Sequence, residues 1–542
     1  MQAKKRSEGI LRRAFFEEQQ LGYLFASCAV FVLIRVLIAM LLDVSALAYL
    51  FPAFELFFFA FLLFHFLLRR ILARNIRYYI ERKQLRNAKE ECKRAYRLFL
   101  FPTFLLSLLL GMGGLKFSVY LNGAPKSGYA FSLAAFLPLL LFLQGMIQAQ
   151  WEGDFKKSFS TFADLLRMLL SLLFAVFFAL FGDQYGKRVD LLLYTNDSAY
   201  CYVAIFSVIG LLLANLITLL FLLTAHIKFR TDMARQLKKA KPAFLSKDLP
   251  LITLMFQGFF HLFLPELLLL SGIFLTVFFH HLRRPDRDLP SLVGMYYAYF
   301  HSFSLLISLV VVIPFLKSGT RLIRAWKRKR RELSLSLYRQ FIHGQCVILF
   351  PLSAFFLALS EQIGTSLFGI STPMMNRLLG CGAFLMIFVS LSISGGVVLS
   401  AVHLRRLCLF NSFASSMIGG ILLVGGIFLF KKGLSVVILS EIAYFFIYDL
   451  LLLYELDAMM QVHGRDLVKT FLLPFGIASV CAFVIYVIGR PLKLLVGDIV
   501  TMMGCIVVGT LLYLYLIRRL HGLTDHEIAV LDRNLNFRKK RE

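Results

Sequence analysis

The stretch from Leu137 to Leu166 reads LPLLLFLQGMIQAQWEGDFKKSFSTFADLL. It is a hydrophobic helix that becomes polar at its end, crosses a short turn containing Lys156 and Lys157, and leads into a second helix. Apolar helical runs joined by short basic turns are typical of a protein that crosses a membrane many times. We therefore interpret this stretch as one unit of a larger, repeated architecture.

A weaker copy of this unit occurs 249 residues later, where Arg405 and Arg406 take the places of Lys156 and Lys157. A second anchor keeps the same offset, because RLFLFP at 97–102 corresponds to CVILFP at 346–351. Each anchor follows a basic connection, which we interpret as a helical elbow. Two anchors at one offset predict an internal duplication, as in many transporters.

Composition places the chain in the class of helical membrane proteins. Hydrophobic residues make up 59% of the 542 residues, the mean hydropathy is +0.75, and no nucleotide-binding P-loop is present. Apolar runs of about 20 residues, enough to cross the hydrocarbon core, predict about fourteen transmembrane helices. They lie near 22–42, 48–68, 98–119, 129–149, 161–182, 200–226, 251–280, 291–316, 340–361, 374–402, 409–430, 434–455, 469–489 and 494–517.

The net charge of +28 has a topological explanation. Most of the 59 Lys and Arg residues fall in alternate connections, and the positive-inside rule then places both termini in the cytoplasm. This distribution argues against a nucleic-acid partner and predicts basic inner loops that attract anionic lipids. We expect a multi-pass protein of the cytoplasmic membrane.

The predicted organisation has two six-helix lobes and a terminal helix pair. Its segments are an amphipathic cytoplasmic lead-in at 1–21, an N-lobe at 22–226, a linker at 227–250, a C-lobe at 251–455, the terminal pair at 456–517 and a cytoplasmic tail at 518–542. The first span is interpreted as retained, without a cleavage site. The eight scattered cysteines form no CxxC pair, so neither disulfides nor a metal site is expected.

Ionisable residues inside predicted spans are the candidates for a binding site, since they are costly in a membrane. Arg35 and Glu55 lie in the first two spans and could form an ion pair between helices, either for packing or for a ligand. His261 and Glu266, next to Pro265, form the sharpest polar cluster, in the seventh span. A capped structural kink is the alternative interpretation.

Further polar candidates lie in later or neighbouring spans. Gln144 and Gln148 share one helix face at the inner end of the fourth span, as a cavity lining or as interhelical hydrogen bonds. Gly145 beside them would allow close helix approach. His301 lies in the eighth span, and Asp449 is the most deeply placed acid of the twelfth.

This pattern resembles the multidrug, oligosaccharidyl-lipid and polysaccharide (MOP) flippase superfamily. Within it the chain is similar to the polysaccharide-biosynthesis and stage V sporulation protein B-like members, with the lipid II flippases as relatives. The phrases that carry the resemblance are KQLRNAKEECKRAYRLF, LAAFLPLLLFLQGMIQAQWEG and the closing RRLHGLTDHEIAVL. Together with the fourteen spans, the resemblance covers nearly the whole chain.

The resemblance implies two helical bundles around a central cavity that opens alternately to each side of the membrane. It implies transport of a polyprenyl-pyrophosphate-linked saccharide without enzymatic chemistry and without a cofactor, and glycan-assembly enzymes are candidate partners. Substrate-binding positions would be Arg35, Glu55, His261, Glu266 and His301, with Gln144, Gln148 and Asp449 lining the cavity. An arginine suits a pyrophosphate, because its guanidinium binds phosphate oxygens in pairs.

Other functional classes remain open. Basic inner loops could dock an ATPase if the chain were the permease of an ATP-driven exporter, and a divergent member could act as an envelope-synthesis scaffold. A membrane glycosyltransferase or acyltransferase would need acids or histidines near the surface. Those available are Asp43 and the group His280, His281, Asp286 and Asp288, which is interspersed with repelling arginines.

Overall fold

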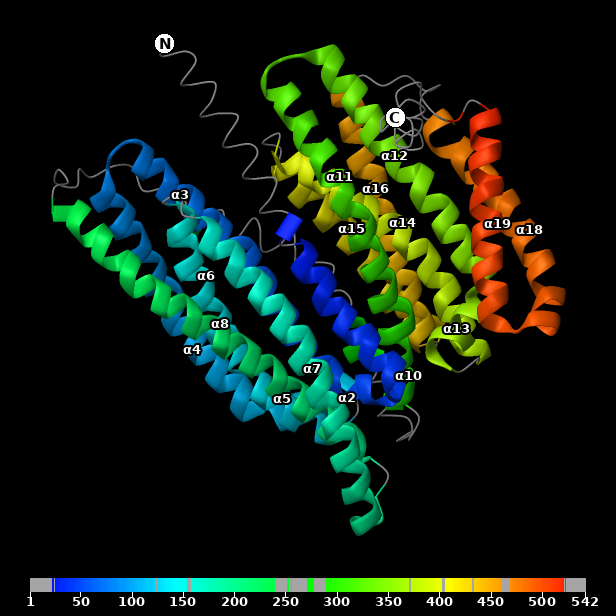
Figure 1. Cartoon of the computed structure of the whole chain (residues 1–542), viewed down its shortest axis with the longest axis horizontal. Coiled ribbons are helices and arrows are strands. Elements are labelled where there is room, and N and C mark those ends of the chain that lie inside the picture. The colour runs from blue at the N-terminus through cyan, green and yellow to red at the C-terminus, as the bar shows by residue number, and fades with distance from the viewer. Residues whose placement is uncertain are drawn as a thin grey trace, which may run out of the picture. The chain divides into compact units, whose positions relative to one another are not determined.

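The computed structural model describes residues 22–23, 25–122, 124–153, 157–195, 197–238, 251–252, 255, 271–276, 289–369, 372–401, 405–430, 433–460, 468–520 and 522. Every regular element in this part of the chain is a helix (Figure 1). Twelve of these helices are long and apolar enough to cross a membrane, and the shorter apolar helix Phe25–Leu41 lies at the predicted first span. Most of the predicted seventh span lies outside the described residues. The chain is therefore an all-α, multi-pass membrane protein.

The helices belong to two compact units. The amino-terminal unit comprises Tyr23–Ala298 with Ser412–Glu441. Its elements are the helix Phe25–Leu41, α2 (Val44–Phe61), η1 (Leu62–Leu68), α3 (Arg69–Glu81), α4 (Leu85–Asn122), η2 (Pro125–Ser127), α5 (Gly128–Ala134), α6 (Leu137–Gly153), α7 (Lys157–Leu193), α8 (Ser198–Lys238), α10 (Leu289–Met295) and η4 (Gly426–Phe430).

The carboxy-terminal unit comprises Met1–Gly22, Tyr299–Asn411 and Ile442–Glu542. Its elements are α11 (Phe303–Lys327), α12 (Arg331–Ala358), α13 (Ser360–Phe368), α14 (Pro373–Ala401), η5 (Val468–Leu472), α18 (Leu473–Val496) and α19 (Asp498–Arg519). The helices η3 (Tyr296–Ser302), α15 (Arg405–Gly425) and α16 (Gly433–Met460) contribute to both units. The predicted terminal helix pair is α18 and α19, which lie side by side, with α18 packed on α12 (Figure 1).

The second predicted span continues far beyond the membrane core as one helical rod. Asp43 caps its start, since its side chain accepts a hydrogen bond from the backbone N–H of Ser45 at 2.8 Å. The rod then runs through α2, the π-helical η1 and α3, and covers 38 residues. At 1.5 Å per residue this is about 57 Å, well above the hydrocarbon thickness of about 30 Å. The basic residues of α3 therefore continue a membrane helix, as predicted for this elbow.

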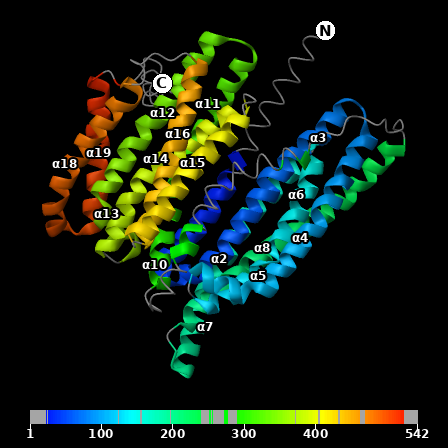
Figure 2. The ribbon, with the colours of Figure 1, turned by 180° about the vertical axis from the view of Figure 1, so that it is seen from behind.

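Figure 2 shows two helical elbows, one between α3 and α4 and one between α11 and α12, and the two share the same backbone geometry. Lys83 between α3 and α4 has a φ of 61°, and Lys329 between α11 and α12 has a φ of 56°. Each lysine N–H donates to the carbonyl three residues earlier at 2.9 Å. The N–H groups of Gln84 and Arg330 donate to the carbonyl five residues earlier, at 2.9 and 3.1 Å. This repeated left-handed helix end supports the duplication predicted from the sequence.

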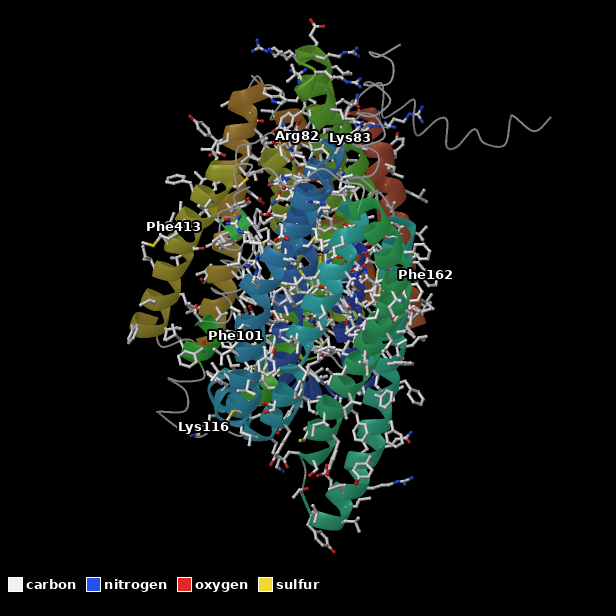
Figure 3. All side chains as sticks on the ribbon, turned by 90° about the vertical axis from the view of Figure 1, so that its left-hand side faces the viewer. Arg82, Lys83, Phe101, Lys116, Phe162 and Phe413 are labelled. Atoms are coloured by element: carbon white, nitrogen blue, oxygen red, sulfur yellow. The ribbon has the colours of Figure 1, made fainter. Side chains whose placement is uncertain are left out.

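Phenylalanines that point away from their helices mark surfaces suited to lipid. Phe101 on α4 is 68% exposed, and Figure 3 shows it directed outward. Phe162 on α7 and Phe413 on α15, which the repeat places close to equivalent positions, are exposed and point outward in the same way (Figure 3). Side chains of this kind are stable in contact with hydrocarbon and costly in water. The helices that follow the two repeated basic turns therefore each present a phenylalanine on their outer face.

Candidate functional site

The predicted ion pair between the first two spans is confirmed. Arg35 on the helix Phe25–Leu41 is 1% exposed, and its Nη1 lies 2.9 Å from Oε1 of Glu55 on α2. The guanidinium also approaches the backbone carbonyl of Phe54 at 3.5 Å. A charge in this position must be paired or neutralised, because the membrane interior solvates ions poorly.

Two neighbouring tyrosines on η3 contact two carboxylates of the amino-terminal unit. Tyr297 donates its hydroxyl hydrogen to Oε1 of Glu55 at 2.5 Å, and its ring centroid lies 4.9 Å from Cζ of Arg35. Tyr296 donates in the same way to Oε2 of Glu441 at 2.5 Å. Arg35 is thus enclosed by a carboxylate and an aromatic face, an arrangement that stabilises a buried guanidinium.

A larger buried network, which we call the Arg69 cluster, lies around the guanidinium of Arg69. Its members are His65, Arg69, Gln148, Glu152, Ser160, Asp164 and Arg167, all buried. Arg69 Nε donates to Glu152 Oε1 at 2.9 Å, and Nη2 donates to the same oxygen and, at 2.7 Å, to Asp164 Oδ2. Nη1 donates to Gln148 Oε1 at 3.0 Å. One guanidinium thus connects α3, α6 and α7.

The second arginine of the cluster closes its other side. Arg167 Nη2 donates to Asp164 Oδ1 at 3.0 Å, and the two residues form an ion pair one turn apart on α7. Its Nη1 lies 2.9 Å from Nδ1 of His65, one turn before Arg69. Two arginines and two carboxylates balance to zero formal charge. A neutral, extensively hydrogen-bonded cluster of this kind suits a fixed joint between helices better than a site that attracts a charged ligand.

The glutamines proposed to line a cavity form bonds between helices. Gln144 Nε2 donates to the backbone carbonyl of Asn215 on α8 at 2.7 Å, and its Oε1 lies 3.3 Å from His65 Nε2. Gln148 belongs to the Arg69 cluster. Gly145 lies between the two glutamines and permits the close approach of α6 to η1, because a Cβ there would lie 2.8 Å from the carbonyl oxygen of Phe64. Of the two roles considered for these glutamines, hydrogen bonding between helices is the one seen in this structure.

Arg69, Glu152 and His65 were not among the candidates chosen from the sequence. A signal for them was present in the spacing of four residues that places side chains on one helix face. His65 and Arg69 are separated by four residues, as are Gln148 and Glu152, and Ser160 and Asp164. Three such pairs on consecutive helix ends would have indicated a shared polar layer.

The remaining candidates lie elsewhere. His301 is buried on η3, and Asp449 is buried on α16 of the carboxy-terminal unit, where Oδ1 accepts a hydrogen bond from Ser392 at 2.6 Å. His261 and Glu266 lie outside the described residues, as do His280, His281, Asp286 and Asp288. Asp43 caps α2 and accepts a hydrogen bond from Tyr200 at 3.0 Å, which is a structural role.

Comparisons with known proteins identify the fold. No protein-family model matches the chain, and no curated protein matches its sequence. Among solved structures, the lipid II flippase MurJ in an inward closed conformation aligns with a TM-score of 0.58 and 16% identity, over 92% of this chain and 98% of its own. A multidrug resistance MATE transporter of the MOP superfamily, in an inward-facing conformation, aligns with a TM-score of 0.53 and 12% identity, over 82% and 96%.

A third structure, a MOP superfamily transporter from Pyrococcus furiosus, aligns with a TM-score of 0.51 and 10% identity, over 82% of this chain and 96% of its own. All three neighbours are transporters or flippases rather than enzymes. The alignments run over nearly the full length of each neighbour. The resemblance seen in the sequence is therefore confirmed for the architecture, and the chain has the fold of the MOP superfamily.

Proposed function

We propose that this protein is a flippase that moves a polyprenyl-pyrophosphate-linked saccharide across the cytoplasmic membrane by alternating access. The observation that carries the proposal is the fold, which matches a lipid II flippase over 98% of that protein. The MATE neighbour covers only 82% of this chain, against 92% for MurJ. The greater coverage by the lipid II flippase supports a lipid-linked substrate over a small soluble one.

Arg35 is the proposed partner of the pyrophosphate. Its guanidinium can bind two phosphate oxygens at once, and it lies inside a membrane helix with Glu55 as its partner. Because Arg35 is 1% exposed, a phosphate would reach it only after the contact with Glu55 opens. Exchange of one anion for another would then couple substrate binding to a rearrangement of the first two helices.

Further elements of this proposal concern the remaining candidates and the topology. We place Glu55, His261, Glu266 and His301 with Arg35 as substrate contacts, and Asp449 near the transport path. Both termini would lie in the cytoplasm, and the lobes would follow the boundaries predicted from the sequence. Anionic lipids would contact the basic inner elbows, and glycan-assembly enzymes would supply the substrate.

The proposal is tested by reconstituting the purified protein in liposomes with fluorescent polyprenyl-pyrophosphate sugars. A membrane-impermeant quencher then reports how much of the label has changed leaflet. We expect flipping by the wild type and a loss of at least about tenfold in Arg35→Met, which corresponds to about 1.4 kcal/mol. Lys93→Met, which removes an exposed charge paired with Glu90, is the matched control and should flip normally.

A variant without either charge separates binding from folding. Arg35→Met/Glu55→Met removes the ion pair without leaving a buried unpaired charge, so it should fold and still fail to flip. Normal flipping by this variant would exclude Arg35 as the phosphate contact. No flipping by the wild type with several glycans would contradict the flippase itself, and copurification with an ATPase would then favour an exporter permease.

A further inference from the structure

Asp449 differs from Glu55 and Asp164, the buried carboxylates that are paired with arginines. Glu55 is paired with Arg35, and Asp164 is paired with both Arg69 and Arg167. Asp449 is 3% exposed and lies within the span Leu434–Ala458, yet it forms no ion pair with the described residues. Glu55 and Asp164 thus have cations as partners, whereas among the described residues Asp449 has one hydroxyl.

The two oxygens of this carboxyl group are in unequal surroundings. Oδ1 accepts a hydrogen bond from the Ser392 hydroxyl on α14 at 2.6 Å. Oδ2 is buried and has no hydrogen-bond partner among the described residues. An ionised carboxylate distributes its charge over both oxygens, so leaving one of them without a donor in a nonpolar medium is strongly unfavourable. A neutral carboxylic acid, with its hydrogen on Oδ2, fits these surroundings much better.

Polar side chains on the adjoining helices do not replace the missing cation. Ser394 on α14 donates to Gln345 Oε1 on α12 at 2.8 Å, and Gln345 Nε2 is buried without a partner among the described residues. Two hydrogen-bonded Ser–acceptor pairs therefore connect α14 with α16 and with α12, and each leaves one polar atom unsatisfied. These atoms mark a polar layer inside the unit.

The packed elements carry basic as well as neutral and acidic groups. The cations are Arg331 and Arg339 on α12 and Arg377 on α14, and among the described contacts none of the three forms an ion pair with Asp449. The other titratable groups are Glu332, Tyr338, His343 and Cys346 on α12, Cys381 on α14, Cys408 on α15, and Glu441, Tyr444, Tyr448, Tyr454, Glu455 and Asp457 on α16 itself. Cys346 lies close enough to Asp449 for an electrostatic interaction. Glu455 accepts a hydrogen bond from Asn411, and Asp457 accepts one from Tyr338 at 2.6 Å. None of these contacts supplies a positive charge to Asp449, and the side chains of Arg405 and Arg406 lie outside the described ones.

We propose that Asp449 is a proton-binding site, protonated in this arrangement and deprotonated when the helices around it open to water. The chemistry is the reversible exchange of one proton between Oδ2 and water. A metal ion would need several oxygen ligands at once, and Ser392 Oγ is the side-chain oxygen that the described contacts bring to this carboxyl group. One carboxyl and one hydroxyl are sufficient for a proton. The use of this proton to drive transport rests on the proposed function, whereas the site itself does not.

Infrared difference spectroscopy on the purified, full-length protein tests the site directly. A protonated carboxylic acid has a C=O stretching band that a carboxylate lacks, and the band shifts in deuterated water. We expect this band in the wild type at neutral pH and its loss in Asp449→Asn. Ser392→Ala should retain the band at a shifted frequency, because the acid remains and its hydrogen bond is removed. Asp457→Asn, the same change two turns along α16, should leave the band unaltered.

The spectrum decides between outcomes without any transport assay. A band that persists unchanged in a folded Asp449→Asn protein, or a wild type without the band, would overturn the proposal. A band that disappears when sodium is added at constant pH would also overturn it, because Asp449 would then be a sodium ligand. Confirmation of folding by the unfolding temperature in detergent accompanies each variant.

Flipping under an imposed pH gradient tests the coupling separately. If Asp449 carries the driving proton, the gradient accelerates flipping at least tenfold in the wild type and in Asp457→Asn, and leaves Asp449→Asn unaffected. A wild type that does not flip while its infrared band depends on Asp449 would reject the proposed function and retain the proton site. A wild type that flips at the same rate as Asp449→Asn under the gradient would support the proposed function and reject Asp449 as the carrier of the driving proton.

Discussion

Arg69 and Glu152 are joined twice, because Nε and Nη2 of the guanidinium both donate to the same carboxylate oxygen. The two residues are 83 positions apart in the chain and lie on α3 and α6. Asp164 on α7 completes the arrangement with its own ion pair to Arg69. Three helix ends are therefore fixed to one cation, and the consequences can be measured.

Removal of the central cation should be severely destabilising. Arg69→Met leaves Glu152 and Asp164 buried with less positive charge than they need, at a cost of about 3–5 kcal/mol of unfolding free energy. Denaturant or thermal unfolding in detergent measures the loss. The control is Lys93→Met, whose partner Glu90 is exposed, so that its effect should stay below about 1 kcal/mol. Equal effects of the two substitutions would show that the Arg69 cluster contributes nothing beyond a surface pair.

The contact of α6 with η1 depends on the absence of a side chain at Gly145. In Gly145→Ala the added Cβ would lie 2.8 Å from a backbone oxygen that cannot rotate away, and we expect a loss of about 1–3 kcal/mol in unfolding free energy. Gly504→Ala on α19 is the matched control, since its Cβ would meet nothing within 4 Å. It should be neutral or stabilising by up to about 1 kcal/mol. An unchanged unfolding midpoint for Gly145→Ala would mean that these helices are not so closely packed.

The elbow lysines should gain stability on replacement by glycine. Left-handed backbone costs an L-residue about 1–2 kcal/mol, and the greater freedom of glycine in the unfolded chain cancels about half of this gain. Lys83→Gly and Lys329→Gly should each stabilise the protein by up to about 1 kcal/mol in chemical unfolding. Lys83→Ala loses the same charge without relief of the backbone, so a gain of equal size there would assign the effect to charge.

The hydroxyl of Tyr297 should contribute to the stability of the Arg35–Glu55 pair. Tyr297→Phe removes the 2.5 Å hydrogen bond to Glu55 and leaves the ring beside the guanidinium. A hydrogen bond to a charged group contributes about 1.5–3 kcal/mol, which unfolding in detergent would detect. Tyr454→Phe serves as the control because Tyr454 is 75% exposed. Indistinguishable stabilities would indicate that Glu55 is satisfied without Tyr297.

The sequence predicted the features that depend on composition along the chain. Apolar runs located the spans, because burial in lipid requires about 20 consecutive apolar residues regardless of their neighbours. The elbows followed from basic segments that continue a helix, and their equivalence followed from a constant offset. The pair Arg35–Glu55 could be predicted because a charge in the membrane needs a partner and the next span offered one.

Contacts between segments that are distant in the sequence could not be predicted from it. Arg69 directly follows the predicted span 48–68, so the sequence placed it in a basic connection. In the structure the helix continues through η1, and Arg69 is 4% exposed inside the amino-terminal unit. The left-handed backbone at Lys83 carries no glycine signal in the sequence. For Asp449, the number of donors around each oxygen could be known only after α14 and α16 had been placed side by side.

The sequence by itself determined that the chain is a multi-pass helical membrane protein with a repeated, basic inner elbow. These features arise from the order of apolar and charged residues along the chain and need no knowledge of contacts between distant segments. Only the tertiary structure decided which buried charges are neutralised and which are not. Helix packing brings Glu152 and Asp164 to Arg69, whereas among the described residues it brings a serine hydroxyl and no cation to Asp449. In a medium that solvates ions poorly, that difference in partners determines whether a carboxyl group serves as a fixed joint or as a site that can exchange a proton.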